Sequence, residues 1–217
     1  MFISFEGIDG SGKSTQIGLL QAVLEAEGRS VVVTRDPGGT PLGRELRQIL
    51  LHHKGEVAPG CELFLYLADR AQHVVTLIRP ALAEGKVVLC DRFVDSTVAY
   101  QGGGRGMDGG MIDRLNQQAT EGLVPDKTIL LDGSVETLLG RARSRATATA
   151  TAKATVPDQT DRFETLDVAF YERVRAQYLN LAKESPARFI VVNAVQPPES
   201  VHQDIIRALA LNPLPKT

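Results

Sequence analysis

Tryptophan is absent from the 217-residue chain, and its seven Phe and four Tyr residues make up only 5% of it. This scarcity argues against an aromatic platform on which single-stranded nucleic acid stacks. Basic residues do not outnumber acidic ones, with 24 Lys and Arg against 26 Asp and Glu. The net charge of −2 therefore disfavours a broad surface that coats polymeric nucleic acid or an anionic membrane, although it leaves room for a small basic pocket.

Cysteine and long apolar runs are also scarce. Cys61 and Cys90 alone can form neither a disulfide framework nor a four-ligand zinc site, so we expect two reduced thiols. No apolar run approaches the ~18 residues that a membrane span needs. The first residues lack the basic and apolar regions of a secretory signal, because a short apolar start leads directly to Glu6. These absences predict a cytoplasmic protein without a membrane partner.

Short apolar runs alternate with longer helical patterns along the chain. The runs are apolar throughout, as expected of parallel strands that are covered on both faces. The order is therefore βαβα, which predicts an α/β fold: a single domain over residues 1–217, with a five-stranded parallel sheet and helices on both faces. The predicted strands are Phe2–Phe5, Ser30–Thr34, Val87–Cys90, Thr128–Leu131 and Arg188–Val192. The predicted helices cover about residues 13–27, 62–79, 108–121, 135–145 and 166–183.

One segment departs from this pattern. Arg145–Thr155 reads RATATATAKAT and has no large apolar side chain to bury, so we interpret it as a mobile surface loop between two helices. Basic residues outnumber acidic ones around it. This positive charge favours a lid at about residues 141–162 that becomes ordered over a polyanion. The alternative is a solvated basic loop without a function.

Residues 7–14 read GIDGSGKS and fit the phosphate-binding pattern G-x-x-x-x-G-K-[ST] between an apolar strand and a helix. Glycines let the backbone turn and direct N–H groups at phosphate oxygens, and the helix adds its positive N-terminal end. Lys13 is expected to reach the β- and γ-phosphates, and the Ser14 hydroxyl to bind Mg²⁺. The segment therefore predicts a P-loop NTPase. The residues expected around the nucleotide are Gly7, Ile8, Asp9, Gly10, Ser11, Gly12, Lys13, Ser14 and Thr15.

A carboxylate ends the apolar run VVLC at Asp91. This arrangement is typical of the acid that holds Mg²⁺ in P-loop enzymes, so Asp91 joins Ser14 as a predicted metal ligand. Arg92 follows directly, at the carboxyl edge of the sheet where ligands bind in open α/β folds. A guanidinium there can clamp an acceptor phosphate and share the charge that develops during phosphoryl transfer.

Three classes of P-loop protein are compatible with these motifs. Residues 36–39 fit the D-x-x-G pattern of a GTP switch, but no N/T-K-x-D sequence that reads guanine follows them. A nucleotide-driven machine or a regulatory binding module usually needs a further domain, for which this chain is short. A small phosphotransferase needs only a second substrate beside the γ-phosphate and a lid that excludes water. We favour the phosphotransferase and keep the regulatory module as an alternative.

Tyr66 and Arg70 lie four residues apart on the predicted helix over residues 62–79, at the edge of its apolar stripe. An aromatic ring beside a planar donor fork suits the stacking of a nucleobase and donation to its carbonyl group. The pattern alone favours the alternative, an ordinary tyrosine at the edge of the core and a surface arginine.

Together these motifs resemble the thymidylate kinase family. The stretches that carry the resemblance are collinear and span most of the chain: FEGIDGSGKST (5–15), TRDPGGTPLGRELR (34–47), YLADR (66–70), CDRFVDSTVAYQGGGRG (90–106) and DRFE (161–164). The resemblance implies a nucleoside-monophosphate-kinase fold, phosphate transfer from ATP to dTMP for dTTP biosynthesis, Mg²⁺ as cofactor, and usually a homodimer. A kinase of the same fold that acts on dUMP or dCMP is the alternative.

The family's roles carry over to individual positions. Arg92 would bind the dTMP phosphate and bridge donor and acceptor, and Asp9 would lie near the sugar and the P-loop. Arg70 would donate to a thymine carbonyl, while Thr97 and Gln101 would read the edge of the base. The residues that the resemblance assigns to dTMP are Asp36, Pro37, Arg47, Tyr66, Arg70, Arg92, Ser96, Thr97, Tyr100, Gln101 and Arg105.

Some members of the family carry an arginine inside the P-loop, where this chain has Gly10. The chain thus resembles the bacterial type whose lid supplies the cation. Arg145 is the cation that we expect from the lid, and Arg143 and Arg162 are expected to contact the nucleotide. The predicted catalytic set is Lys13, Arg92, Asp9 and Arg145.

Overall fold

Residues 1–152 and 167–211 are described by the structure, which is a computed structural model. Five parallel strands form one sheet in the order β2-β3-β1-β4-β5, which confirms the predicted fold class. Each predicted strand is present, and its observed ends lie within one residue of the expected ones. The strands are β1 (Phe2–Glu6), β2 (Val31–Arg35), β3 (Val87–Asp91), β4 (Lys127–Asp132) and β5 (Phe189–Asn193).

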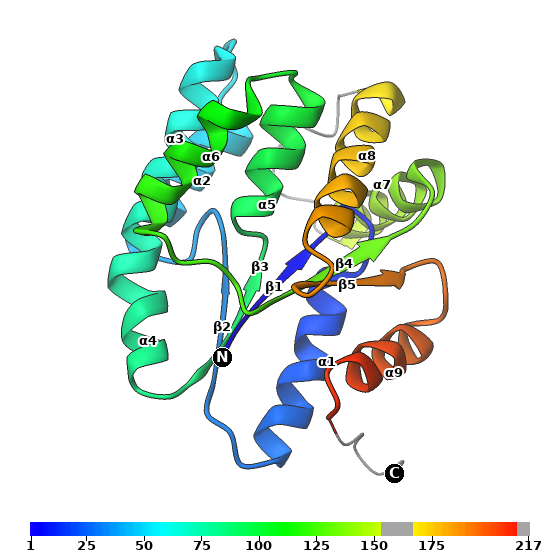
Figure 1. Cartoon of the computed structure of the whole chain (residues 1–217). Coiled ribbons are helices and arrows are strands. Elements are labelled where there is room, and N and C mark those ends of the chain that lie inside the picture. Colours follow the sequence, from blue (N-terminus) through cyan, green and yellow to red (C-terminus); the bar gives the residue numbers. More distant parts are fainter. Residues whose placement is uncertain (153–166, 212–217) are drawn as a thin grey trace.

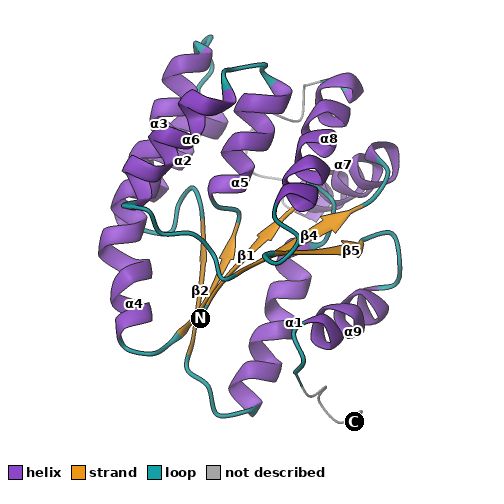
Figure 2. Cartoon of the chain, in the orientation of Figure 1, coloured by secondary structure: helices purple, strands orange, loops and turns teal. Residues whose placement is uncertain are grey.

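Helices cover both sides of the sheet. They are α1 (Lys13–Ala26), α2 (Pro41–His52), α3 (Pro59–His73), α4 (Arg79–Ala83), α5 (Val94–Thr97), α6 (Gly109–Thr120), α7 (Val135–Ala152), α8 (Val168–Glu184) and α9 (Pro198–Ala208), with wider π-type turns at η1 (Val74–Ile78) and η2 (Val98–Gly104). Figures 1 and 2 show α1 and α9 on one side of the sheet, and α5 and α8 on the other. Within the described ranges, no helix is both long and apolar enough to cross a membrane.

Strand β1 lies at the centre of the sheet, and all five of its residues are buried. A central parallel strand is covered on both faces, which explains why its sequence shows no alternation of apolar and polar residues. Ser4 is a polar residue in this strand, and its hydroxyl group pairs with Thr128 Oγ1 of β4 at 3.0 Å. The buried Ser4 hydroxyl group thus has its hydrogen-bond partner within the sheet.

The carboxyl ends of β1, β2 and β3 meet at one edge of the sheet. The P-loop, residues 7–12, follows β1, while Asp36 follows β2 and Arg92 follows β3. Phe5 of β1 is in register with Asp91 of β3, so the phosphate loop and the predicted metal ligand are neighbours. This edge is where open α/β sheets bind their ligands.

Helix α7 is longer than the sequence indicates. It spans Val135–Ala152 and includes Arg145–Ala152, so the prediction of a surface loop was wrong for these residues. Alanine has the highest helix propensity, and extending a helix costs far less than nucleating one, so alternating Ala and Thr residues can continue α7. The remainder of the predicted loop and lid, residues 153–162, lies outside the described residues.

The predicted helix over residues 62–79 begins earlier and continues further. It starts as α3 at Pro59 and runs through η1 into α4, which ends at Ala83. Proline suits the first turn of a helix, because the N–H group that it lacks has no partner there. The second π-type segment, η2, carries Tyr100 and Gln101, and such widened turns often occur at functional sites.

Candidate active site

Two glycines with a left-handed backbone shape the P-loop, Gly10 with φ 83° and Gly12 with φ 92°. A Cβ atom at Gly10 would lie 1.8 Å from the carbonyl oxygen of Leu138 in α7. A backbone atom cannot move away as a side chain can, so only glycine lets α7 pack directly on the loop. This close approach brings the basic part of α7 to the phosphate-binding end of the sheet.

Lys13, the first residue of α1, folds back over the P-loop. Its Nζ donates to the carbonyl oxygens of Gly7 at 2.9 Å and Ile8 at 3.2 Å. Burial, followed by repulsion from Arg92, lowers the pKa of Lys13 to about 8. The amine is therefore held at the centre of the loop, where phosphate oxygens can replace these carbonyls as acceptors.

One cavity, here called the P-loop cavity, gathers most of the residues predicted to bind phosphate and metal. Its lining residues are Asp9, Gly10, Gly12, Lys13, Ser14, Arg35, Asp36, Arg47, Asp91, Arg92 and Arg145. Asp91 Oδ1 is buried and has no hydrogen-bond partner among the described residues. A buried carboxylate oxygen without a donor fits a hard cation, and the Ser14 hydroxyl in the same cavity is a second suitable ligand.

A second cavity, the α7 cavity, lies between α1, α7 and the loop after β5. It is lined by Gly10, Ser11, Gly12, Thr15, Gln16, Thr137, Gly140, Arg141, Ser144, Arg145, Ala194, Gln196, Pro198 and Val201. Arg141, which the sequence analysis did not select, donates to the carbonyl oxygens of Ala194 at 2.6 Å and Val195 at 2.9 Å. These bonds tie α7 to the loop after β5 and form one wall of the cavity.

The predicted cations of the lid fall in different places. Arg145 lines both the P-loop cavity and the α7 cavity, as expected of a residue that contacts phosphate. Arg143 is exposed on α7 and lines neither of these cavities in the described part of the chain. Arg162 lies outside the described residues, so its predicted contact stays a prediction.

A third cavity, the Tyr66 cavity, adjoins the P-loop cavity and has an empty volume of about 530 Å³. Its lining residues are Asp9, Asp36, Pro37, Arg47, Leu51, Tyr66, Arg70, Arg92, Ser96, Thr97, Tyr100 and Gln101. Every residue that the sequence assigns to the acceptor, apart from Arg105, is in this set. The mixture of ring, carboxylate and guanidinium groups that line this cavity suits a nucleotide.

Arg92 lies between the P-loop cavity and the Tyr66 cavity and lines both. Its backbone has φ 69°, an uncommon conformation for a side chain of this size and one that is often found at functional sites. Its guanidinium group donates to Asp9 Oδ1 at 2.8 Å and to the hydroxyl groups of Ser96 and Tyr100 at 3.2 Å each. The fixed cation thus lies where a phosphate in either cavity would reach it.

Glu6, which the sequence analysis missed, is the last residue of β1 and binds groups that neighbour Arg92. Its carboxylate accepts hydrogen bonds from the Phe93 backbone N–H at 2.8 Å, the Ser96 hydroxyl at 2.6 Å and the Tyr178 hydroxyl at 2.7 Å. Burial, with a further contribution from the Asp95 carboxylate, raises the pKa of Glu6 to about 7. The backbone after Arg92 is therefore anchored to the end of β1.

Replacing Glu6 by glutamine is expected to change how stability depends on pH. A raised pKa in the folded state means that the stability contributed by the protonated Glu6 is lost as the pH rises from about 4.5 through 7. Glutamine cannot titrate, and its neighbours can rotate their hydroxyl groups to accept from its amide. Between pH 5 and pH 8, urea unfolding should show the wild type losing up to about 3 kcal/mol relative to the variant. A difference that is constant with pH would contradict this expectation.

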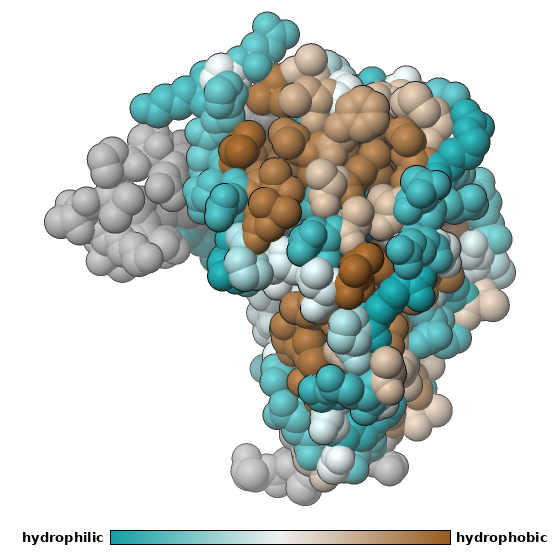
Figure 3. All heavy atoms as spheres, turned by 90° about the vertical axis from the view of Figure 1, so that its left-hand side faces the viewer, coloured by the Kyte–Doolittle hydropathy of each residue, from teal (hydrophilic) through white to brown (hydrophobic). Residues whose placement is uncertain are grey.

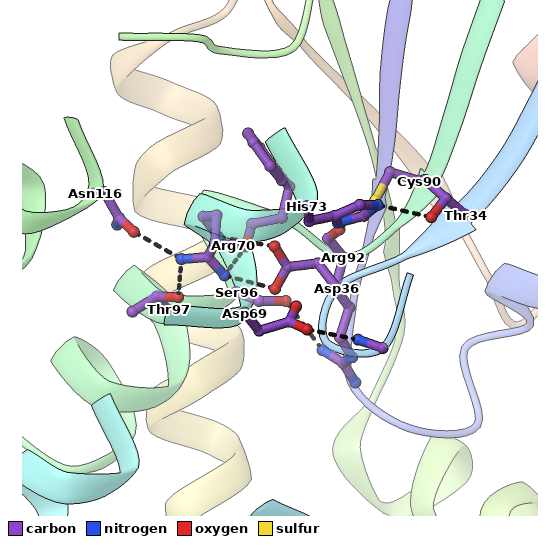
Figure 4. A network of polar contacts seen from close by, with 12 residues as sticks. Thr34, Asp36, Asp69, Arg70, His73, Cys90, Arg92, Ser96, Thr97 and Asn116 are labelled. Atoms are coloured by element: carbon purple, nitrogen blue, oxygen red, sulfur yellow. Dashed lines mark hydrogen bonds and ion pairs between the residues drawn. The ribbon is translucent and has the colours of Figure 1, made fainter. Parts of the chain in front are cut away.

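Arg70 is the centre of a buried polar network beside the Tyr66 cavity (Figure 4). Its Nε and Nη2 each donate to a different carboxylate oxygen of Asp36 at 2.9 Å. The remaining N–H groups reach Thr97 Oγ1 and Asn116 Oδ1 at 2.7 Å and the Phe93 carbonyl oxygen at 3.3 Å. Arg70 is only 1% exposed, so it is buried in the interior and does not lie at the edge of the apolar stripe as predicted. All five N–H groups have protein acceptors, so a bond to a base carbonyl requires one acceptor to be exchanged.

Two more buried side chains on α3 hold the turn after β2. Asp69 Oδ1 accepts a hydrogen bond from the Gly38 backbone N–H at 3.2 Å, and His73 Nε2 pairs with Thr34 Oγ1 at 2.7 Å. Burial and then the neighbouring Asp36 carboxylate raise the pKa of Asp69 to about 7. The turn that carries Asp36 to the cavities is therefore fixed from α3.

Arg105 does not line the Tyr66 cavity, in contrast to its predicted place. It pairs instead with Glu62 in the first turn of α3, with Nη2 at 2.8 Å from Oε2 and Nε at 3.0 Å from Oε1. Glu62 is fully buried and also accepts from Gln101 Nε2 at 2.9 Å. Arg105 and Glu62 thus form a layer behind Gln101, and Glu62 is a residue that sequence reasoning missed.

A phosphate loop after the first strand, with two cavities that meet at one fixed arginine, is the architecture of a nucleoside-monophosphate kinase. A family model described as thymidylate kinase matches residues 5–205. The chain belongs to the thymidylate kinase family, and it phosphorylates dTMP to dTDP.

Similar proteins cover the chain almost end to end. The thymidylate kinase of Trichlorobacter lovleyi is 49% identical over 210 residues, which are 96% of this chain and 96% of that protein. The thymidylate kinase of Solidesulfovibrio magneticus is 53% identical over 206 residues, with 94% and 96% covered. A crystal structure of thymidylate kinase from Ehrlichia chaffeensis superposes with a TM-score of 0.76 at 36% identity, over 96% of this chain and 98% of that one.

Proposed function

We propose that the γ-phosphate of ATP is transferred in line to a phosphate oxygen of dTMP at the junction of the P-loop cavity and the Tyr66 cavity. The observation that carries this proposal is the position of Arg92, which lines both cavities. In this arrangement ATP occupies the α7 cavity and the P-loop cavity, and dTMP occupies the Tyr66 cavity. Because the acceptor phosphate is already ionised, the reaction needs positioning and charge neutralisation rather than a strong general base.

The predicted catalytic residues divide this work between them. Lys13 neutralises the β- and γ-phosphates, and Arg92 holds the dTMP phosphate and shares the charge that develops between donor and acceptor. Asp9, whose Oδ1 accepts from Arg92 Nη2 at 2.8 Å, orients that guanidinium group. Arg145, which lines the P-loop cavity, supplies the cation from the lid side.

Mg²⁺ fits the P-loop cavity, and Ser14 and Asp91 are the residues that would hold it. The supporting observation is the buried Asp91 Oδ1, which has no hydrogen-bond partner within the described ranges. When bound, the ion would neutralise charge on the transferred phosphate. Both residues line the same cavity.

A lid at about residues 141–162 is a part of the proposal, within one domain over residues 1–217. Its described part is the end of α7, which packs on Gly10 and carries Arg141 and Arg145 into the α7 cavity. Closure of this segment over ATP would exclude water and so limit hydrolysis.

The acceptor range is tested by an assay of ADP release with ATP, Mg²⁺ and a panel of monophosphates. We expect dTMP to give the highest kcat/KM, with dUMP lower because it lacks the 5-methyl group, and dCMP far lower. A higher kcat/KM for dUMP or dCMP than for dTMP would overturn the proposed acceptor. Omission of Mg²⁺ should abolish ADP release, and full activity in excess chelator would remove the metal from the proposal.

The second copy of the chain in a homodimer is proposed to cover α3 and η1. Phe64 on α3 is 61% exposed and Val75 on η1 is 52% exposed, and eleven residues are about three helical turns, so both lie on a similar face. Figure 3, which views the side that carries α2, α3, α4 and α6, shows large hydrophobic side chains gathered on this face. A patch of this kind favours association, because burying apolar surface stabilises a complex.

Substituting Phe64 with glutamate is expected to convert the dimer into a monomer, since a charge would replace an apolar side chain at the interface. Light scattering coupled to size exclusion measures the mass directly. Val168→Glu is the matched control, because Val168 is 50% exposed at the first turn of α8, where an acidic residue is favourable. A Phe64 variant that stays dimeric would move the interface to another face.

A further inference from the structure

Glu62 is buried directly behind the wall of the Tyr66 cavity. It is 0% exposed, and its Oε1 accepts from Gln101 Nε2 at 2.9 Å while both of its oxygens accept from Arg105. A carboxylate in an ion pair can only accept hydrogen bonds. The amide of Gln101 must therefore turn its NH₂ group toward Glu62.

This constraint decides what Gln101 presents to a ligand. Gln101 lines the cavity, and with its nitrogen held by Glu62 the atom left to face a ligand is the carbonyl oxygen Oε1. An unrestrained glutamine can flip and so exchange its donor and acceptor. Here a flip would place two oxygens against each other and remove a donor from a buried charge, which is costly.

The neighbouring Thr97 is constrained in the opposite sense. Its Oγ1 accepts from Arg70 Nη1 at 2.7 Å, so the hydroxyl proton remains available for donation into the cavity. The wall thus presents a fixed acceptor at Gln101 beside a donor at Thr97. Thymine and uracil carry an N3–H donor next to a carbonyl acceptor, whereas cytosine carries an N3 acceptor next to an amino donor.

We propose that Glu62 is a positioning residue that selects, through Gln101, acceptor nucleotides whose base carries an N3–H group. The inference rests on the proposed function, because it places the base of dTMP against Gln101. It extends that function by assigning the discrimination between thymine and cytosine to a residue that does not touch the nucleotide. Sites built around a fixed hydrogen bond reject an analogue that cannot form it far more strongly than apolar pockets reject a size difference.

The decisive variant is Glu62→Gln, which keeps the shape of the side chain and allows the Gln101 amide to flip. The ratio of kcat/KM for dTMP to kcat/KM for dCMP should fall at least tenfold. A merely structural role would lower both values in proportion and leave the ratio unchanged. Thermal unfolding of the variant establishes that it is folded before the ratio is interpreted.

Two further variants separate orientation from charge. Arg105→Gln removes the ion pair but leaves the Glu62 carboxylate facing Gln101, so the dTMP preference should be retained even where kcat falls. The exchanged pair, Glu62→Gln with Gln101→Glu, again fixes an acceptor toward the cavity, because the amide introduced at position 62 can donate to the new carboxylate. This double variant should recover the preference that the single variant loses.

An unchanged ratio in Glu62→Gln, an equal loss of both activities, or a failure of the exchanged pair to restore the preference would each overturn the inference. The proposed function fails separately, on the wild type alone, if dTMP is not phosphorylated. Wild-type activity on dTMP with an unaltered preference in Glu62→Gln would therefore refute only the role of Glu62.

Discussion

Replacing Lys13 by methionine is expected to lower kcat about a thousandfold, which is typical for the loss of one preorganised charge at a transition state. Lys13 is 8% exposed, and its amine is held over the P-loop by two backbone carbonyl groups. Methionine keeps the apolar stem but removes the ammonium group that can follow charge onto the transferred phosphate. Rapid-quench measurement of a single turnover at saturating ATP and dTMP tests the effect on the chemical step.

The same variant should bind dTMP almost normally, because Lys13 lines the P-loop cavity but not the Tyr66 cavity. Calorimetric titration with dTMP is the control, and a Kd within about threefold of the wild type is expected. A kcat within tenfold of the wild type would remove Lys13 from the mechanism. A large loss of dTMP affinity would instead show that the P-loop is distorted.

A pH series adds an independent check on this role. The pKa of Lys13 in the free enzyme is lowered to about 8 by burial, so raising the pH above 8 removes its charge before ATP binds. At pH values above 8, the wild-type KM for ATP should consequently increase. The KM of the methionine variant should not show this increase, because methionine has no proton to lose.

The parts of the fold and site that sequence predicts are those encoded in contiguous segments. Five apolar runs located the strands to within one residue. The inner strands β3, β1 and β4 need apolar side chains on both faces. The edge strands β2 and β5 are also apolar in sequence, although Val33 and Val191 are exposed. The P-loop and Arg92 directly follow strands and Asp91 is the last residue of β3, so the parallel topology itself brings them together. Local composition does not predict the end of α7, because extending the helix that already precedes it costs far less than nucleating a new one.

Partners that are distant in sequence could not be derived in the same way. Arg70 reaches Asp36, Thr97 and Asn116, which are separated from it by 34, 27 and 46 residues, and no local pattern encodes these pairings. Glu62 carried only a weak signal, namely an acidic residue among the apolar positions of a helix. Glu6 carried a stronger one, because it ends an apolar strand as Asp91 does, and the same reasoning would have selected it.

Arg70→Met is expected to destabilise the folded protein by about 3–5 kcal/mol, in addition to any effect on the base. The ion pair with Asp36 is 1% exposed on the arginine side and fully buried on the aspartate side. Removing the guanidinium group leaves a charged carboxylate in the interior without its two donors. Thr97 Oγ1 and Asn116 Oδ1 also lose the hydrogen bonds that they accept from Arg70. Urea unfolding of the variant at pH 7.5 measures this loss.

The double variant Arg70→Met with Asp36→Leu is the matched control, because it removes both charges and leaves no ion unpaired. It should recover at least half of the lost stability, since an apolar pair of similar volume can replace a buried ion pair. A single variant that loses less than about 1 kcal/mol would mean that water reaches the Asp36 carboxylate. The comparison also decides how base discrimination in Arg70 variants is read: a defect that persists in the stabilised double variant belongs to recognition, whereas one that disappears belongs to folding.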